Sequence, residues 1–207
     1  MPILYIHGMG GGADSRIPSI LREESLDVIV RTYDFDPEVA AGQVASWVAE
    51  LNPELIIGES LGSLHALRIS GVPKILVSPA LNAPIYFEIM AWMTMIPGMT
   101  KLFDRIYRPR EGDRQPLHFT FDILRKYMPH RRMALQAASG SSDPIFALIG
   151  IKDHYRKSGV VSVHTWKKYF GEAFVLYDGT HFTEEEYVRG LLKDIILKTL
   201  NTKITEK

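Results

Sequence analysis

Six short hydrophobic runs, rich in valine, isoleucine and leucine, recur along the chain. Their apolar positions are nearly continuous rather than alternating, which is typical of strands buried on both faces of a parallel sheet. The runs cover residues 3–7, 27–33, 54–58, 74–78, 145–150 and 173–178. Helical patterns lie between them, over residues 15–24, 37–51, 61–70, 158–170 and 184–200. This alternation predicts a doubly wound α/β fold with a mostly parallel six-stranded sheet.

One connection between the predicted strands is much longer than the others. Residues 84–143 separate the fourth run from the fifth, whereas a crossover needs only about a dozen residues. The connection begins with the apolar, methionine-rich residues 85–99 and continues with basic, proline-punctuated sequence. We therefore expect a helical cap over residues 84–143, inserted in a single domain that spans residues 1–207.

Composition narrows the classes of function. Basic and acidic residues both number 24, so the chain lacks the basic excess of a nucleic-acid binder, and we expect no nucleic-acid partner. The absence of cysteine excludes disulfides and a cysteine nucleophile. Residues 85–99 are shorter than the ~20 residues of a membrane span, and the residues before the first strand lack a basic n-region, so we expect no secretory signal. We therefore expect a cytoplasmic protein with no membrane span.

The third run leads directly into a serine between two glycines. Gly58, Ser60 and Gly62 fit the pattern G-x-S-x-G, and the residues from Leu61 onward are compatible with a helix. A nucleophile in a sharp strand-to-helix turn needs small neighbours, so that strand and helix can pack closely around it. The pattern predicts Ser60 as a catalytic nucleophile, and the alternative is a serine that only caps the helix.

Two later residues fit the base and the acid that a serine nucleophile needs. Asp153 follows the fifth run and His181 follows the sixth, so both are expected at the same sheet edge as Ser60. Enzymes built on this turn carry the acid before the histidine in the chain, as here. Two other carboxylates are alternatives: Asp178 could hold the histidine instead, whereas Asp143 precedes its strand and is expected at the opposite edge.

The first run leads into the loop HGMGGGAD, whose glycines allow backbone amides to approach an anion closely. Gly8, Gly10 and Ala13 also fit the dinucleotide pattern G-x-G-x-x-G/A, and Asp34 has nearly the spacing of a ribose-binding acid. A dinucleotide-dependent oxidoreductase is therefore a rival interpretation. Pro18 counts against it, because a proline in the first turn of the next helix has no amide to offer a phosphate.

Three glutamates after His181 invite a metal-site interpretation. Thr183 and Glu186 instead have the spacing of a capping box, and acidic residues suit the first turn of a helix. No H-E-x-x-H or comparable ligand pattern occurs in the sequence. We therefore predict that a helix begins there and that the protein holds no metal.

The cap is the candidate for substrate specificity. Half of the 8 methionines lie in its first part among aromatic residues, and methionine adapts to varied apolar shapes. The candidate lining of an acyl pocket is Tyr86, Met90, Trp92 and Met93. Ordinary packing or a homodimer contact are the alternatives for these side chains. Residues 84–135 also hold nine basic and five acidic residues, which would steer an anionic substrate or simply be solvated.

Over essentially the whole chain, the sequence resembles the α/β-hydrolase superfamily. The motifs that carry the resemblance are the HG pair at 7–8, GESLG at 58–62, Asp153 and the GTH that ends at His181. The short form is similar to small bacterial esterases of the YqiA type. The resemblance implies an oxyanion hole from the amides of Met9 and Leu61. It also implies hydrolysis of a small carboxylic ester or thioester through an acyl-enzyme, without a cofactor. A catalytically silent member that acts as a binding module is the alternative.

Overall fold

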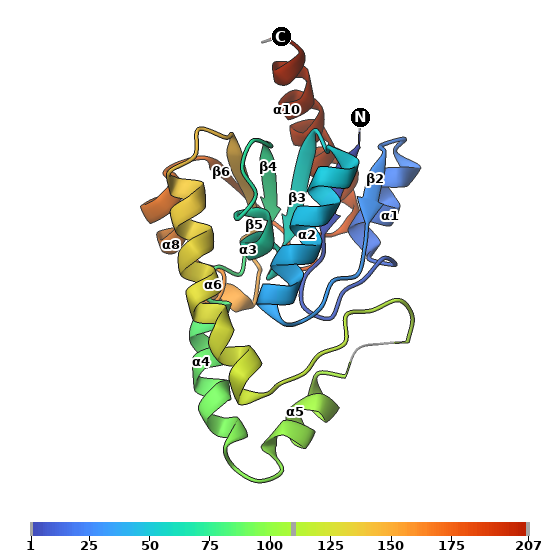
Figure 1. The fold of residues 1–207 in the computed structure, drawn as a ribbon. Coiled ribbons are helices and arrows are strands. Elements are labelled where there is room, and N and C mark those ends of the chain that lie inside the picture. Colours follow the sequence, from blue (N-terminus) through green and yellow to red (C-terminus); the bar gives the residue numbers. More distant parts are fainter. Residues whose placement is uncertain (1, 109–110, 206–207) are drawn as a thin grey trace.

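A six-stranded parallel sheet forms the centre of the computed structural model, which describes residues 2–108 and 111–205 (Figure 1). The strand order is β2-β1-β3-β4-β5-β6. The strands are β1 (Ile3–Ile6), β2 (Val28–Val30), β3 (Leu55–Glu59), β4 (Lys74–Val77), β5 (Ile145–Gly150) and β6 (Phe174–Tyr177). Each of the six hydrophobic runs forms one of these strands, so the predicted fold class is confirmed.

Helices cover both faces of the sheet, which explains why its strands are apolar at nearly every position. In β1, Leu4 and Ile6 pack on one side, while Ile3 and Tyr5 pack on the other. The first side is covered by α2 (Pro37–Leu51), α3 (Gly62–Ala66), α6 (Phe121–Ser139) and α8 (Val163–Phe170). The second side is covered by α1 (Arg16–Glu23), the π-helical turn η1 (Val188–Leu192) and α10 (Lys193–Thr205).

Three predicted helices differ from the observed ones. The helix predicted over 61–70 ends at Ala66, because the amides of Arg68 and Ile69 then bond three residues back rather than four. The helix predicted over 158–170 begins only at Val163, as α8, because Gly159 with a φ of 80° ends the preceding α7 (Tyr155–Ser158) and Ser162 caps a new helix. The pattern over 184–200 is continuous in space but passes through α9 (Glu185–Tyr187), η1 and α10.

The connection between β4 and β5 contains α4 (Ala83–Thr94), α5 (Met99–Ile106) and α6. Helix α6 packs against α4 and also reaches α2, α3 and α8, so it joins this segment to the helices over the sheet. In Figure 1, α4 and α5 extend beyond the sheet at the end opposite the C-terminus. No helix among the described residues combines the length and the apolarity needed to cross a membrane.

The strand order marks one place on the sheet where a ligand site is expected. From β1 the chain moves to one side to form β2 and then returns to form β3 on the other side of β1. At such a switch point the loops after neighbouring strands diverge and leave a crevice at the carboxyl ends of the strands. The HG pair follows β1 and Ser60 follows β3, so both candidate motifs lie at this crevice.

Candidate active site

Ser60 occupies a strained turn between β3 and α3. Its φ is 49°, a left-handed conformation that non-glycine residues rarely adopt. The backbone holds it there, because its amide donates to Val77 O at 2.9 Å and its carbonyl accepts from Ala80 N at 3.1 Å. A Cβ on Gly62 would lie 2.4 Å from His7 O, so only glycine lets the turn pack on β1.

A chain of hydrogen bonds joins Ser60, His181 and Asp153. The distance from Ser60 Oγ to His181 Nε2 is 3.0 Å, and His181 Nδ1 lies 2.8 Å from Asp153 Oδ2. The other carboxylate oxygen, Asp153 Oδ1, accepts the amide of Tyr155 at 2.8 Å. The side chain of Asp153 is fully buried and that of His181 nearly so. A buried carboxylate at Nδ1 keeps the proton there, so Nε2 is free to accept the hydroxyl proton of Ser60.

The two other carboxylates that the sequence offered lie elsewhere. Asp178 is exposed and pairs with Lys152 at 2.8 Å. Asp143 pairs with the buried Lys74 at 2.9 Å, beside the first residues of β4 and β5 and thus at the opposite edge of the sheet. The structure therefore brings Asp153 to His181, and neither alternative contacts the ring.

The loop after β1 lies directly against Ser60. A Cβ on Gly8 would be 3.1 Å from Ser60 Cβ, which shows how closely the two turns approach. His7 Nδ1 lies 2.8 Å from Gly8 O, and Gly11 N donates to the same oxygen at 3.0 Å. Because Gly8 O and the Met9 amide belong to one trans peptide, these bonds also fix the direction of that amide. Burial lowers the pKa of His7 to about 4, so its ring is neutral when it donates.

Two backbone amides beside Ser60 have no hydrogen-bond acceptor among the described residues. Within the described residues, neither Met9 N nor Leu61 N donates a hydrogen bond to the protein. Met9 follows the glycine that packs on Ser60, and Leu61 follows Ser60 itself. Unpaired amides at a turn and at the start of a helix suit an oxygen that carries negative charge.

Sequence patterns did not reveal the residues that hold the glycine-rich loop. Gln115 is fully buried. Its backbone N–H donates to Gly11 O at 2.7 Å, and its side-chain Oε1 accepts a hydrogen bond from Gly10 N at 3.0 Å. Tyr33 donates to His7 O at 2.6 Å and stacks on the His7 ring. Gln115 belongs to the segment between α5 and α6, where no motif or periodicity distinguishes it, so only the fold could identify it.

The predicted capping box between Thr183 and Glu186 does not form in the loop that carries His181. Helix α9 begins after Glu184 without a side-chain cap, and Thr183 is buried with a φ of 48°. The Thr183 hydroxyl instead bonds to Tyr177 OH at 2.7 Å, while Glu184 accepts the amide of Thr180 at 3.1 Å. Arg16 of α1 donates to the carbonyls of Phe182 and Thr183. A helix therefore begins here as predicted, but Thr183 and Glu184 hold the histidine loop instead of forming a capping box.

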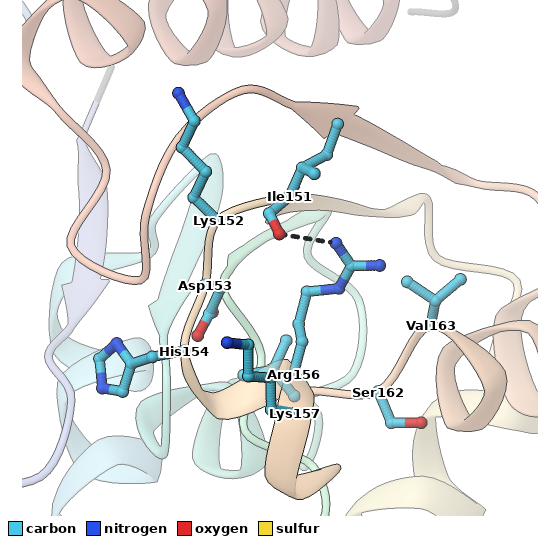
Figure 2. Close-up of a pocket in the computed structure, with 9 residues that line it drawn as sticks. Ile151, Lys152, Asp153, His154, Arg156, Lys157, Ser162 and Val163 are labelled. Atoms are coloured by element: carbon cyan, nitrogen blue, oxygen red, sulfur yellow. Dashed lines mark hydrogen bonds between the residues drawn. The ribbon is translucent and has the colours of Figure 1, made fainter.

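A pocket of about 630 Å³ lies beside the Asp153 loop (Figure 2). It is formed by the loop after β5, by α7 and by the start of α8, and Arg156 bonds to Ile151 O across one wall. The lining residues are Ile151, Lys152, Asp153, His154, Arg156, Lys157, Val161, Ser162 and Val163. Three lysine and arginine side chains make it basic, and its only acid, Asp153, is held by His181.

The four cap residues expected to line an acyl pocket do not line this one. Tyr86, Trp92 and Met93 are exposed, while Met90 packs partly buried against the core. The hydroxyl of Tyr86 donates to Ser158 O, which joins α4 to α7. Their role in binding an acyl group thus stays a prediction. Within the described part of the chain, no group of histidine or acidic residues could hold a metal ion.

Comparison with known proteins identifies the fold. No family model and no curated protein sequence matches the chain. It is similar to the monoacylglycerol lipase of Paleococcus ferrophilus, with a TM-score of 0.64 at 16% identity over 97% of this chain and 94% of that one. A thermophilic esterase from Thermogutta terrifontis gives 0.57 at 16% identity over 96% and 90%. A thioesterase domain of the curacin biosynthetic pathway gives 0.57 at 14% identity over 94% and 90%. The chain has the α/β-hydrolase fold.

Proposed function

We propose that this protein is a serine hydrolase that cleaves a small carboxylic ester or thioester through an acyl-enzyme on Ser60. The observation that carries the proposal is the hydrogen-bond chain from Asp153 through His181 to Ser60 Oγ, built from three separate loops. Structures similar in fold include an esterase, a lipase and a thioesterase, which support hydrolysis of an acyl bond. Among α/β-hydrolases, small esterases of the YqiA type are the relatives we propose.

In the acylation step, Ser60 Oγ attacks the carbonyl carbon while His181 Nε2 accepts the hydroxyl proton. The carbonyl oxygen becomes an oxyanion, to which the amides of Met9 and Leu61 donate; one such donor contributes about 3 kcal/mol to the transition state. His181 then protonates the leaving alcohol or thiol as its bond to the acyl carbon breaks. Asp153 holds the imidazole tautomer and stabilises its positive charge throughout.

In the deacylation step, water attacks the acyl carbon and gives its proton to His181. The bond between the acyl carbon and Ser60 Oγ then breaks, and His181 returns the proton to the serine. The products are a carboxylic acid and the regenerated enzyme. The reaction needs no group beyond these side chains and amides, so we propose that it proceeds without a cofactor.

The experiment that tests this function is labelling with a fluorophosphonate probe, followed by turnover of short p-nitrophenyl esters and thioesters. We expect the wild type to be labelled at Ser60 and to turn over at least one substrate, whereas Ser60→Ala and His181→Ala lose turnover and keep their circular dichroism. An unlabelled wild type would mean a silent binding module. Full activity in Ser60→Ala would place the nucleophile elsewhere.

A further inference from the structure

Helix α4 is apolar on both of its sides, although only one side is covered. Phe87 and Ala91 are buried against the core, whereas Ile89, Trp92 and Met93 face outward. The exposed residues continue into the turn after the helix, and Leu102 of α5 lies beyond it. Figure 1 shows this turn at the far end of the molecule from α10. Apart from Glu88, which pairs with Arg125 at 3.1 Å, the outer side of α4 is apolar, and an exposed apolar surface of this kind commonly marks a contact site.

We call this surface the apolar tip; it consists of Ile89, Trp92, Met93, Met95, Ile96 and Leu102. Ile89, Trp92, Met95 and Ile96 are each between 58% and 65% exposed. Residues 89–100 contain no charged side chain at all. The tip is thus an uninterrupted apolar projection rather than a set of scattered surface residues.

Basic residues flank the apolar tip. On α5, Lys101 and Arg105 lie on the side next to Leu102, and neither makes an ion pair within the described residues. On α6, Arg125 places its guanidinium 5.7 Å from the ring centre of Trp92 and pairs with Glu88 of α4 at 3.1 Å. An apolar surface with a tryptophan, bordered by Lys101 and Arg105, has the composition of a segment that lies in a membrane interface. The anionic headgroups would meet the lysine and arginine side chains, and the apolar side chains would enter the acyl region.

We propose that the apolar tip docks the protein peripherally on an anionic lipid surface. A second copy of the chain is the other natural occupant, and charge argues against it. A two-fold contact would pair the tip with itself and bring the two rims together. Each rim has a net positive charge, because Lys101, Arg105 and Arg125 outnumber Glu88 and Asp104, and like charges oppose the contact. An anionic lipid surface neutralises the same rim. Docking would also turn toward the lipid the sheet edge that carries Ser60, because α4 starts just after the Ala80 turn that bonds to Ser60 O.

The test is sedimentation with vesicles of phosphatidylcholine, with and without about 30% phosphatidylserine. We expect the wild type to bind the anionic vesicles, and binding to weaken in about 0.5 M NaCl because salt screens the basic rim. Met95→Asp/Ile96→Asp should lose at least about tenfold in partitioning, because two apolar side chains no longer enter the lipid. Lys101→Glu/Arg105→Glu should lose at least about 25-fold on anionic vesicles and little on neutral ones.

The matched control is Val39→Asp on α2, a similarly exposed apolar residue away from the tip, which should bind as the wild type does. Equal thermal unfolding of all variants establishes that they fold. A wild type that does not bind, or a tip variant that binds equally well, would overturn the proposal. So would a wild-type dimer that the tip variant dissociates without any vesicle binding. Ser60→Ala should bind vesicles normally, so failure of docking and failure of the hydrolase assignment are separate results.

Discussion

Replacing Asp153 with asparagine reverses the polarity of one bond in the hydrogen-bond chain. Both carboxylate oxygens are used, one by the Tyr155 amide and one by His181 Nδ1, each at 2.8 Å. Because Tyr155 N donates, the asparagine oxygen must stay on that side, and its NH2 group must face Nδ1. The imidazole then accepts at Nδ1 and carries its proton on Nε2, 3.0 Å from Ser60 Oγ. In that tautomer it can no longer take the serine proton.

The size of the effect follows from burial and from this geometry. The Asp153 side chain has no exposed surface, so water cannot substitute for the lost acceptor. The same change in a serine-protease triad lowers kcat by about 10,000-fold, which corresponds to about 5 kcal/mol of activation free energy. We expect Asp153→Asn to lower kcat by about 1,000- to 10,000-fold, with a small change in KM because its fully buried side chain acts through His181.

The assay is the pH dependence of kcat and KM on a short p-nitrophenyl ester, with Asp178→Asn as the matched control. Asp178 is exposed and pairs only with Lys152, so its variant should stay within about threefold of the wild type. The wrong-tautomer argument also requires that Asp153→Asn keep its fold by circular dichroism. If Asp153→Asn retained more than about a tenth of kcat, or Asp178→Asn were the more damaging change, the assigned acid would be wrong.

Two further predictions follow from the glycine-rich loop and from the buried histidines. In Gly12→Ala, the new Cβ would lie 1.7 Å from Asp113 O, so the segment that holds the loop must move; we expect kcat on a short ester to fall at least about tenfold with KM little changed, and an unchanged kcat would refute this. Burial lowers the pKa of both His7 and His130 to about 4, below their value of about 6.5 in the unfolded chain. The unfolded state therefore binds more protons between these values, and stability present above pH 6.5 is lost as pH falls toward 4, by up to about 3 kcal/mol per histidine. Urea midpoints across this range should decline, less steeply in His130→Gln; equal midpoints at both ends would contradict the burial argument.

The sequence is most informative where local pattern and topology act together. Strands buried on both faces are apolar throughout, so all six could be predicted from the sequence. Helix α2 likewise begins at Pro37 and ends at Leu51, as its cap and periodicity predict. Chain order then places Ser60, Asp153 and His181 at one sheet edge without any knowledge of contacts. Local pattern fails where a tertiary contact decides, as at Thr183, whose hydroxyl bonds to Tyr177 instead of capping a helix. Gln115 could not be predicted from local pattern at all, because the residues it bonds to are about a hundred positions away in the chain.

The glycines of the first loop illustrate what the fold adds to the sequence. Their spacing fits a dinucleotide-binding pattern, yet Gly11 and Gly12 both contact other protein residues. Gly11 O accepts the Gln115 amide, and Gly12 forms an isolated bridge with Arg114. Since Gly11 N also donates to Gly8 O, a continuous path of hydrogen bonds runs from Gln115 to the peptide that carries the Met9 amide. These glycines therefore let the segment after α5 pack against the loop, so we expect a displacement of that segment to disturb the proposed oxyanion hole.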